Sequence, residues 1–210
     1  IIGKTTERMI ERRLRHWLEE NNKLSQNQSG FRKMRSTEDQ LIKLAQCISD
    51  GMHCKPKKKT LLLLIDFEKA FDSVWRAGLK YKLTKMGVPK PFIYWIESWL
   101  TNRRAKARFN GTLSKSKNLT KGVPQGAVLS PLLFDVFIND LAEQLEGTGL
   151  SLFADDAAIW IQDTSIETAI NKLQNAANII SEWSQKWKLK INENKCEFVI
   201  FSSDIKDRKS

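Results

Sequence analysis

The sequence predicts an α+β fold in which a few strands carry helices packed on one face. Three observations favour this class. Of the 210 residues, 41% are hydrophobic and 28% are charged, which is typical of a globular protein and too apolar for general disorder. Helical periodicities are separated along the chain by a small number of short, strand-like runs. No internal repeat, low-complexity linker or clear domain boundary divides the chain.

Two helices and a strand are expected in the first part of the chain, followed by two more helices. Residues 6–20 repeat apolar side chains at helical spacing. Ser36 or Thr37, followed by acidic residues in the next turn, marks the start of a second helix. The aliphatic run 61–65 shows no alternation, as expected for a strand buried on both faces. Helical patterns then follow at roughly 74–86 and 92–101.

The second part of the chain begins with a predicted hairpin. Polar and apolar side chains alternate in the stretch 104–120, and Asn110-Gly111 within it is a strong signal for a hairpin turn. The further elements expected are an apolar helix at about 131–145, strands at 151–154 and 157–161, a long amphipathic helix at 166–189, a last strand at 196–201 and a loose polar tail at 202–210.

Charge is distributed unevenly along the chain, whose formal net charge is +11. Residues 76–125 contain 12 basic groups and one acidic group, whereas residues 126–185 contain one basic group and nine acidic ones. A strongly positive sector beside an acidic one predicts that a polyanion binds next to a site that requires cations. The alternative is that these charges lie on solvated helix faces and have no binding role.

Cysteine usage and hydropathy indicate an intracellular protein of the nucleus, the cytoplasm or both. The three cysteines are an odd number and form no CxxC pair, which argues against a disulfide scaffold and a structural zinc site. The longest strictly aliphatic run has five residues, far short of a membrane span, and no signal-peptide pattern opens the sequence. No membrane partner is therefore expected.

Three carboxylates stand at the ends of predicted strands. Asp66 follows the aliphatic run 61–65, and Asp155-Asp156 lies between two apolar half-strands. Adjacent acids in an apolar hairpin repel each other, and a divalent cation relieves that repulsion. Mg²⁺ prefers such oxygen ligands, and three carboxylates can hold two ions for in-line phosphoryl transfer. The alternative is an ordinary surface turn that happens to carry two acids.

Three motifs, in this order, resemble core motifs of the reverse transcriptases of non-LTR (LINE-like, jockey-like) retrotransposons. They are LIDFEKAFD at 64–72, GVPQGAVLSP at 122–131 and FADD at 153–156. In addition, QSGFR at 28–32 with RST at 35–37 is similar to the fingers motif of that family, and residues 187–201 are similar to the segment after its catalytic hairpin. The resemblance covers about residues 5–201.

The resemblance implies roles for individual residues. Asp66, Asp155 and Asp156 match the catalytic triad and, with the backbone carbonyl of Phe67, the metal ligands. Phe71 matches the aromatic position that excludes a 2′-hydroxyl from the incoming sugar. The nucleotide-binding residues implied are Phe67, Phe71, Gln125, Gly126 and Lys195. The residues expected to contact nucleic acid are Arg32 and Arg35 in the fingers motif and Arg103, Arg104, Lys106 and Arg108 in the predicted hairpin, whose side chains can follow phosphates without reading sequence.

The resemblance also implies an architecture, namely a polymerase palm, which is an antiparallel sheet with helices packed on one face, together with partial fingers and with the thumb absent. The predicted division is partial fingers at 1–60, the first catalytic strand of the palm at 61–75, a fingers–palm connection with the basic hairpin at 76–120, the rest of the palm at 121–201 and the tail at 202–210.

The function implied is RNA-directed DNA polymerisation with two Mg²⁺ ions, Mn²⁺ being the alternative metal. The expected partners are an RNA template, a DNA primer, dNTPs, the remaining thumb and fingers segments, and an endonuclease domain of the full element. Two alternatives stay open: an RNA-templated RNA polymerase with the same palm, and a catalytically silent nucleic-acid-binding relic of a mobile element.

Overall fold

The computed structural model describes residues 2–203, and the chain divides into two compact units. Ile1–Lys23 and Lys69–Phe137 make up the first unit, and Leu24–Glu68 and Ile138–Ser210 make up the second. Each unit therefore combines two separate stretches of sequence. The predicted division into fingers and palm stays a prediction, and the loose tail expected at 202–210 lies outside the described residues from residue 204 onward.

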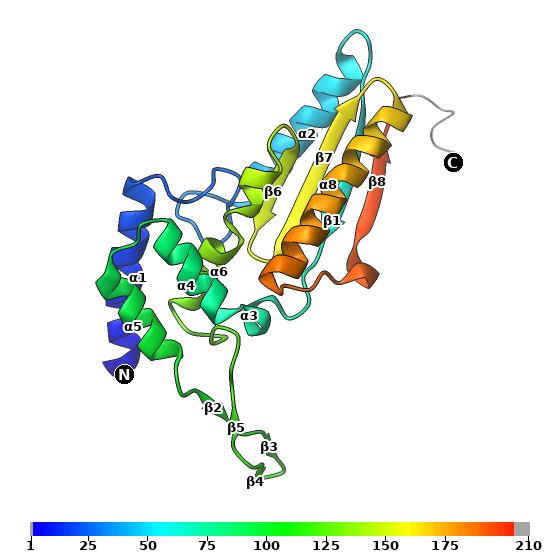
Figure 1. The fold of residues 1–210 in the computed structure, drawn as a ribbon. Helices are drawn as coiled ribbons and strands as arrows, with labels where there is room; N and C mark the ends of the chain where they lie inside the picture. The colour runs from blue at the N-terminus through cyan, green and yellow to red at the C-terminus, as the bar shows by residue number, and fades with distance from the viewer. Residues whose placement is uncertain (1, 204–210) are drawn as a thin grey trace. The chain divides into compact units, whose positions relative to one another are not determined.

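The second unit is built on a four-stranded antiparallel sheet with the order β6-β7-β1-β8. Its strands are β1 (Lys59–Ile65), β6 (Gly149–Phe153), β7 (Asp156–Asp163) and β8 (Glu197–Phe201). Its helices are α2 (Thr37–His53), α7 (Leu141–Gln144), α8 (Ile166–Trp187) and the short 3₁₀ helix η1 (Glu193–Lys195). In Figure 1, α8 runs along β7 and β1. The α+β class and the antiparallel sheet predicted from the sequence are confirmed.

One face of this sheet is buried along β6 and β7 but opens toward β8, where Phe198 is 51% exposed, and the other face is open near the carboxylates. Leu61, Leu152 and Ile159 are completely buried on the first face. On the second face, the indole nitrogen of Trp160 donates to the Cys47 Sγ of α2 at 3.2 Å, so α2 covers the end of the sheet farther from the turn between β6 and β7.

The two-sided burial predicted for 61–65 is wrong in part. Leu63 and Leu64 are only half-buried. The pairing of Leu64 with Ala158 places it on the second face, where it lines a cavity rather than packing under a helix. The aliphatic run is therefore not the mark of a strand enclosed on both sides.

Most helices of the first unit fall near the ranges that the periodicity predicts, but the short helix at residues 70–73 has no predicted counterpart and the helix that begins at Ser130 is shorter than expected. They are α1 (Ile2–Glu20), α3 (Ala70–Ser73), α4 (Arg76–Lys85), α5 (Lys90–Leu100) and α6 (Ser130–Ile138), the last of which ends one residue beyond the unit. Within residues 2–203, no helix has the length and apolar character needed to cross a membrane.

The basic hairpin lies between α5 and α6 in the sequence. It consists of β2 (Arg104–Ala105), β3 (Arg108–Phe109), β4 (Thr112–Leu113) and β5 (Lys117–Asn118), with β2 paired to β5 and β3 paired to β4. Asn110 and Gly111 form the turn, and both have positive φ angles of 45° and 78°. The predicted hairpin and its turn are therefore confirmed.

The start of α2 agrees with the local sequence, whereas the break between α6 and α7 does not follow from it. Ser36 caps α2 in a reciprocal pair of hydrogen bonds with Asp39, as the residue types at this start predict. The single helix expected at 131–145 is wrong, because α6 ends at Ile138 and α7 begins at Leu141. The residues between them bond elsewhere: Asn139 Oδ1 accepts from the Ser25 backbone N–H at 2.7 Å, and Asp140 Oδ1 accepts from the Trp183 indole at 2.9 Å.

Candidate active site

Strand pairing brings the predicted acids together at one end of the sheet. Ala154 and Asp155 form the turn between β6 and β7, and Asp156 begins β7 opposite Phe153. Ile65 is paired with Ala157, so the next position on β1, Asp66, comes beside Asp156. Asp66 and Asp156 line the same cavity of about 600 Å³ on the open face of the sheet.

Two side chains near η1 contact Asp66. Asn192 donates from Nδ2 to Asp66 Oδ2 at 2.9 Å, and the ammonium of Lys195 lies 3.5 Å from the same oxygen. The backbone is fixed as well, because the Asn192 N–H donates to the Asp66 carbonyl at 2.8 Å. Asp66 is thereby held in one orientation while its side chain remains 22% exposed toward the cavity.

The three acids interact electrostatically. Partial burial raises the pKa of Asp156, and the negative charges of Asp155 and Asp66 raise it further, while the Lys195 ammonium opposes this effect. The ionised form of Asp156 is therefore disfavoured by its surroundings, and a bound cation would relieve the repulsion.

These donors suit a hard divalent cation. In the described part of the chain, no group of three or more acidic, histidine or cysteine side chains is already assembled closely enough to hold a metal ion. The carboxylate oxygens of Asp66, Asp155 and Asp156 are nevertheless the ligand type that Mg²⁺ prefers, and the adjoining cavity leaves space for the water and phosphate oxygens that complete its coordination.

The QSG segment of the fingers motif supports the turn that carries Asp155. Leu152 N–H donates to the Asn27 carbonyl at 2.8 Å, and Ser29 N–H donates to the Leu152 carbonyl at 2.9 Å. A Cβ at Gly30 would overlap the backbone of Ala154, which itself has a positive φ of 58°. A side chain at position 30 is thus excluded by the close approach of two backbones.

The two arginines of this motif serve the local fold. Arg32 is only 8% exposed, and its guanidinium donates to the carbonyls of Ser25 at 2.6 Å and Gln28 at 3.3 Å. Arg35 is half-exposed and donates to the Gln26 carbonyl at 2.6 Å. Of the two predicted nucleic-acid contacts, Arg35 is the more accessible.

Phe67 is fixed by its side chain and by its neighbours. The ring is almost fully buried and lies 6.1 Å from the ring of Trp183 between centroids. Its backbone bridges to Ile191, and the next N–H, of Glu68, donates to the Lys190 carbonyl at 2.8 Å. The side chain therefore faces the core, and only the backbone of Phe67 could serve the predicted metal site.

The remaining nucleotide-binding residues predicted from the motifs gather in the first unit. Phe71 is half-buried and stacks on Phe134 with 5.0 Å between ring centroids. Gln125 donates from Nε2 to Asp72 Oδ2 at 2.9 Å, which ties the loop before α6 to α3. Gly122, with a φ of 79°, lies so close to Asp72 that a Cβ there would come within 2.6 Å of its carbonyl oxygen. Gly126 follows in the same loop, also with a positive φ.

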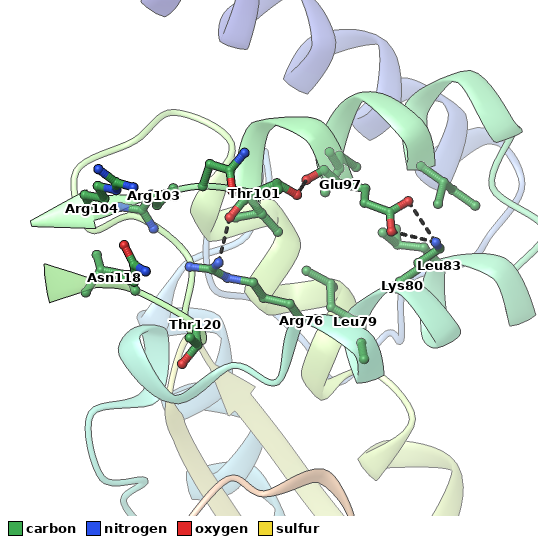
Figure 2. A pocket seen from close by; sticks show the side chains of 16 residues that line it. Arg76, Leu79, Lys80, Leu83, Glu97, Thr101, Arg103, Arg104, Asn118 and Thr120 are labelled. Carbon is green, nitrogen blue, oxygen red and sulfur yellow. Dashed lines mark hydrogen bonds and ion pairs between the residues drawn. The ribbon is translucent and has the colours of Figure 1, made fainter.

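The base of the hairpin meets α4 and α5 around a second cavity of about 580 Å³ (Figure 2). Arg76 of α4 donates to the carbonyls of Leu100 at 2.6 Å, Lys121 at 3.0 Å and Gly122 at 3.0 Å, joining both ends of the hairpin segment to the helices. Burial, and to a smaller extent the charge of Arg103, lower the pKa of Arg76. Arg104, which also lines this cavity, and Lys106 and Arg108 farther along the hairpin are exposed.

Sequence reasoning missed two polar residues that orient predicted ones. Asn192 orients Asp66, and Asp72 orients Gln125. Asn192 stands 126 positions from its partner and belongs to a polar loop without periodicity, so no local pattern could have singled it out. Asp72 is the last residue of the motif LIDFEKAFD at 64–72, and its place in that motif is the one sequence signal that could have identified it as a functional residue.

The antiparallel sheet, with its acids at adjacent strand ends, defines the class of the protein as a nucleic-acid polymerase palm. Residues 1–208 match the family described as "Reverse transcriptase (RNA-dependent DNA polymerase)". The chain belongs to the reverse transcriptase family, within its non-LTR retrotransposon branch.

Relatives of that branch support the assignment. The chain is 33% identical to the RNA-directed DNA polymerase from mobile element jockey of Drosophila funebris, over 98% of this chain and 23% of the relative. It is also 33% identical to the probable RNA-directed DNA polymerase from transposon X-element of Drosophila melanogaster, over 96% of this chain and 22% of the relative. The chain thus spans less than a quarter of the length of these curated relatives.

Solved structures show the same fold at low identity. Telomerase from Candida tropicalis, in complex with a fragment of telomeric RNA, superimposes with a TM-score of 0.69 at 11% identity, over 92% of this chain and 33% of that chain. Telomerase from Candida albicans gives a TM-score of 0.60 at 16% identity, over 91% of this chain and 33% of that chain.

Proposed function

We propose that this chain catalyses RNA-directed DNA synthesis, in which a primer 3′-hydroxyl attacks the α-phosphate of a dNTP and pyrophosphate leaves. The observation that carries the proposal is the pairing of β1 with β7, which sets Asp66 beside Asp156 on an open face with a cavity in front of them. Asp66, Asp155, Asp156 and the Phe67 carbonyl would hold two Mg²⁺ ions, with Mn²⁺ as the substitute.

Bound Mg²⁺ ions would lower the pKa of the attacking hydroxyl and stabilise charge on the phosphates. The protein's own groups position the reactants. Asn192 prevents rotation of the Asp66 carboxylate, and Lys195 supplies a positive charge at the cavity that can meet a triphosphate oxygen. Phe71, supported from behind by Phe134, offers a rigid ring as the wall that rejects a 2′-hydroxyl, and Gln125 and Gly126 present the loop that contacts the nucleotide.

The expected nucleic-acid partners are an RNA template and a DNA primer, held through phosphate contacts by Arg35 and by the hairpin residues Arg103, Arg104, Lys106 and Arg108. Arg32 would act by shaping the same loop. In the complete element, an endonuclease domain and further thumb and fingers segments would work with this domain. The reaction would take place in the nucleus or the cytoplasm.

Primer extension on an RNA template tests the proposal. Asp155→Asn should abolish Mg²⁺-dependent extension while primer–template affinity stays within about twofold, because a carboxylate ligand is lost and the phosphate contacts are kept. Asp163→Asn is the matched control, since Asp163 ends the same strand and pairs with Lys172 at the surface. Because thumb and further fingers segments are expected to act with this chain, the assay uses the longer polymerase that contains it. Wild-type activity in Asp155→Asn, or no extension by that polymerase with either metal, would overturn the proposal.

The same assay separates the proposed activity from the RNA-polymerase alternative. Extension should be efficient with dNTPs and poor with ribonucleotides, and Phe71→Ala should raise ribonucleotide use relative to dNTP use. An unchanged ratio would remove Phe71 as the residue that selects the sugar.

A further inference from the structure

A single aromatic ring stands exposed among the positive charges of the hairpin. Residues 103–121 contain seven basic residues and no acidic one. Phe109, on β3, is 78% exposed within this stretch. Figure 1 shows β3 and β4 at the far end of the hairpin from α5. A single exposed apolar side chain is ordinary on a protein surface, so what distinguishes Phe109 is its position in a strongly basic hairpin.

The ring does not belong to an apolar patch of the kind that docks a protein. The other large apolar residue exposed on the hairpin is Leu113, which is 54% exposed. Phe109 is paired with Thr112, and Arg108 is paired with Leu113. Paired residues share a face of the ladder and successive residues alternate, so Phe109 and Leu113 point to opposite faces. Each is an isolated apolar group, whereas protein-binding surfaces present contiguous ones.

An isolated ring between cationic side chains suits a nucleobase. Every base has a flat π-face that stacks on a phenyl ring, and the seven basic residues of the stretch 103–121 attract the phosphates of the strand. Bases in a duplex are already stacked on each other and leave no face free, so the partner must be single-stranded. The turn at Asn110-Gly111 fixes the geometry of the tip, and Arg76 anchors the base of the hairpin.

We infer that Phe109 stacks on an unpaired base of a single-stranded nucleic acid, which makes the tip of the hairpin a binding site for uncopied template. The inference rests on the proposed function, because that function supplies the single strand. It adds a stacking contact to a surface for which only phosphate contacts were expected.

Binding of a short, unstructured oligouridylate to the 210-residue chain tests this inference. Phe109→Ala should weaken binding on the order of tenfold, while the dependence of the affinity on salt stays as in the wild type, since no phosphate contact is lost. Phe109→Tyr should restore the affinity. Leu113→Ala is the matched control, because it removes an exposed apolar side chain without a π-face and should change the affinity by less than about twofold.

Two further measurements locate the contact. A fully paired RNA–DNA hybrid should bind Phe109→Ala and the wild type equally. Irradiation of iodouridine-substituted RNA should cross-link the peptide that contains Phe109, and the cross-link should disappear in Phe109→Ala. The inference is overturned if Phe109→Ala binds single strands normally, or if Leu113→Ala or the hybrid shows the same loss.

The outcome also distinguishes this inference from the proposed function. If Lys106→Ala reduces the salt dependence while Phe109→Ala has no effect, the stacking contact is wrong and the phosphate contacts stand. If the wild-type chain binds neither the oligouridylate nor the hybrid, both the stacking contact and the proposed function fail.

Discussion

At the scale of single residues, Asp156 shows that the acidic end of the sheet is arranged for something other than stability. Its carboxylate is disfavoured by burial and by two neighbouring carboxylates, with only Lys195 in opposition. A side chain selected for the folded state alone would be neutral at this position. The unfavourable charge is consistent with the proposed cation site, because a bound cation would relieve the repulsion.

Asp156→Asn should therefore raise the stability of the metal-free protein. Because the pKa of Asp156 is raised above 3.8 in the folded state, its ionised form destabilises the fold at neutral pH, and this penalty fades as the pH falls toward 3.8. Urea unfolding in EDTA should show the gain at pH 7 and a smaller gain near pH 4. A variant less stable than the wild type at pH 7 would contradict this account. Asp163→Asn serves as the control and should show no such gain, since it removes a favourable ion pair with Lys172.

At the scale of elements, the hairpin formed by β6 and β7 depends on a segment more than 120 residues earlier in the sequence. Asn27 and Ser29 form backbone hydrogen bonds with Leu152, and Gly30 lies against Ala154. The QSG motif thus acts on the acids through the turn that carries Asp155. If this region contacts a nucleotide, the contact would be made by more accessible residues next to the QSG motif, such as the half-exposed Arg35.

Gly30→Ala should lower the free energy of unfolding by about 1–3 kcal/mol, because the added methyl group would force two backbones apart. Urea denaturation measures this loss. Gly3→Ala is the matched control, since a Cβ at position 3 meets nothing within 4 Å in the helix α1. Equal stability of both variants would show that the turn yields easily and that the support it receives is weak.

The elements also show where sequence is a sufficient guide. The α2 cap, the Asn110-Gly111 turn and the positions of the strands follow from residues within a few positions of each other, so local reading finds them. The break between α6 and α7 depends on Ser25 and Trp183, which are distant in sequence. The same holds for Asn192 at Asp66. A hydrogen bond between polar side chains that are far apart in the sequence produces no periodic pattern. For that reason the sequence did not predict the hydrogen-bond partners that orient the site residues.

At the scale of the whole molecule, charge is separated along the chain, with the basic sector in residues 76–125 and the acidic sector in residues 126–185. Affinity for a primer–template should accordingly fall steeply with salt. Lys106→Ala should reduce the slope of log K against log salt by about 0.9 for a paired region, one phosphate contact being lost. Titrations at several salt concentrations give the slope. Lys57→Ala is the control, since Lys57 is an exposed cation of the loop before β1. Affinity that is independent of salt would exclude phosphate contacts as the main source of binding.

The order of the sheet sets a condition on how this chain can be made. β1 is completed by residue 65, but its two neighbours, β7 and β8, come from residues 156–163 and 197–201. During synthesis, the aliphatic run 61–65 must therefore wait for about a hundred residues with both edges unpaired, a state prone to aggregation. A message that ends before residue 156 would encode a product in which β1 has neither of its neighbouring strands to pair with. Such a product would not fold and would be degraded by cellular proteases. Incomplete copies of the gene would therefore yield no folded protein, whether or not they encode the acidic residues.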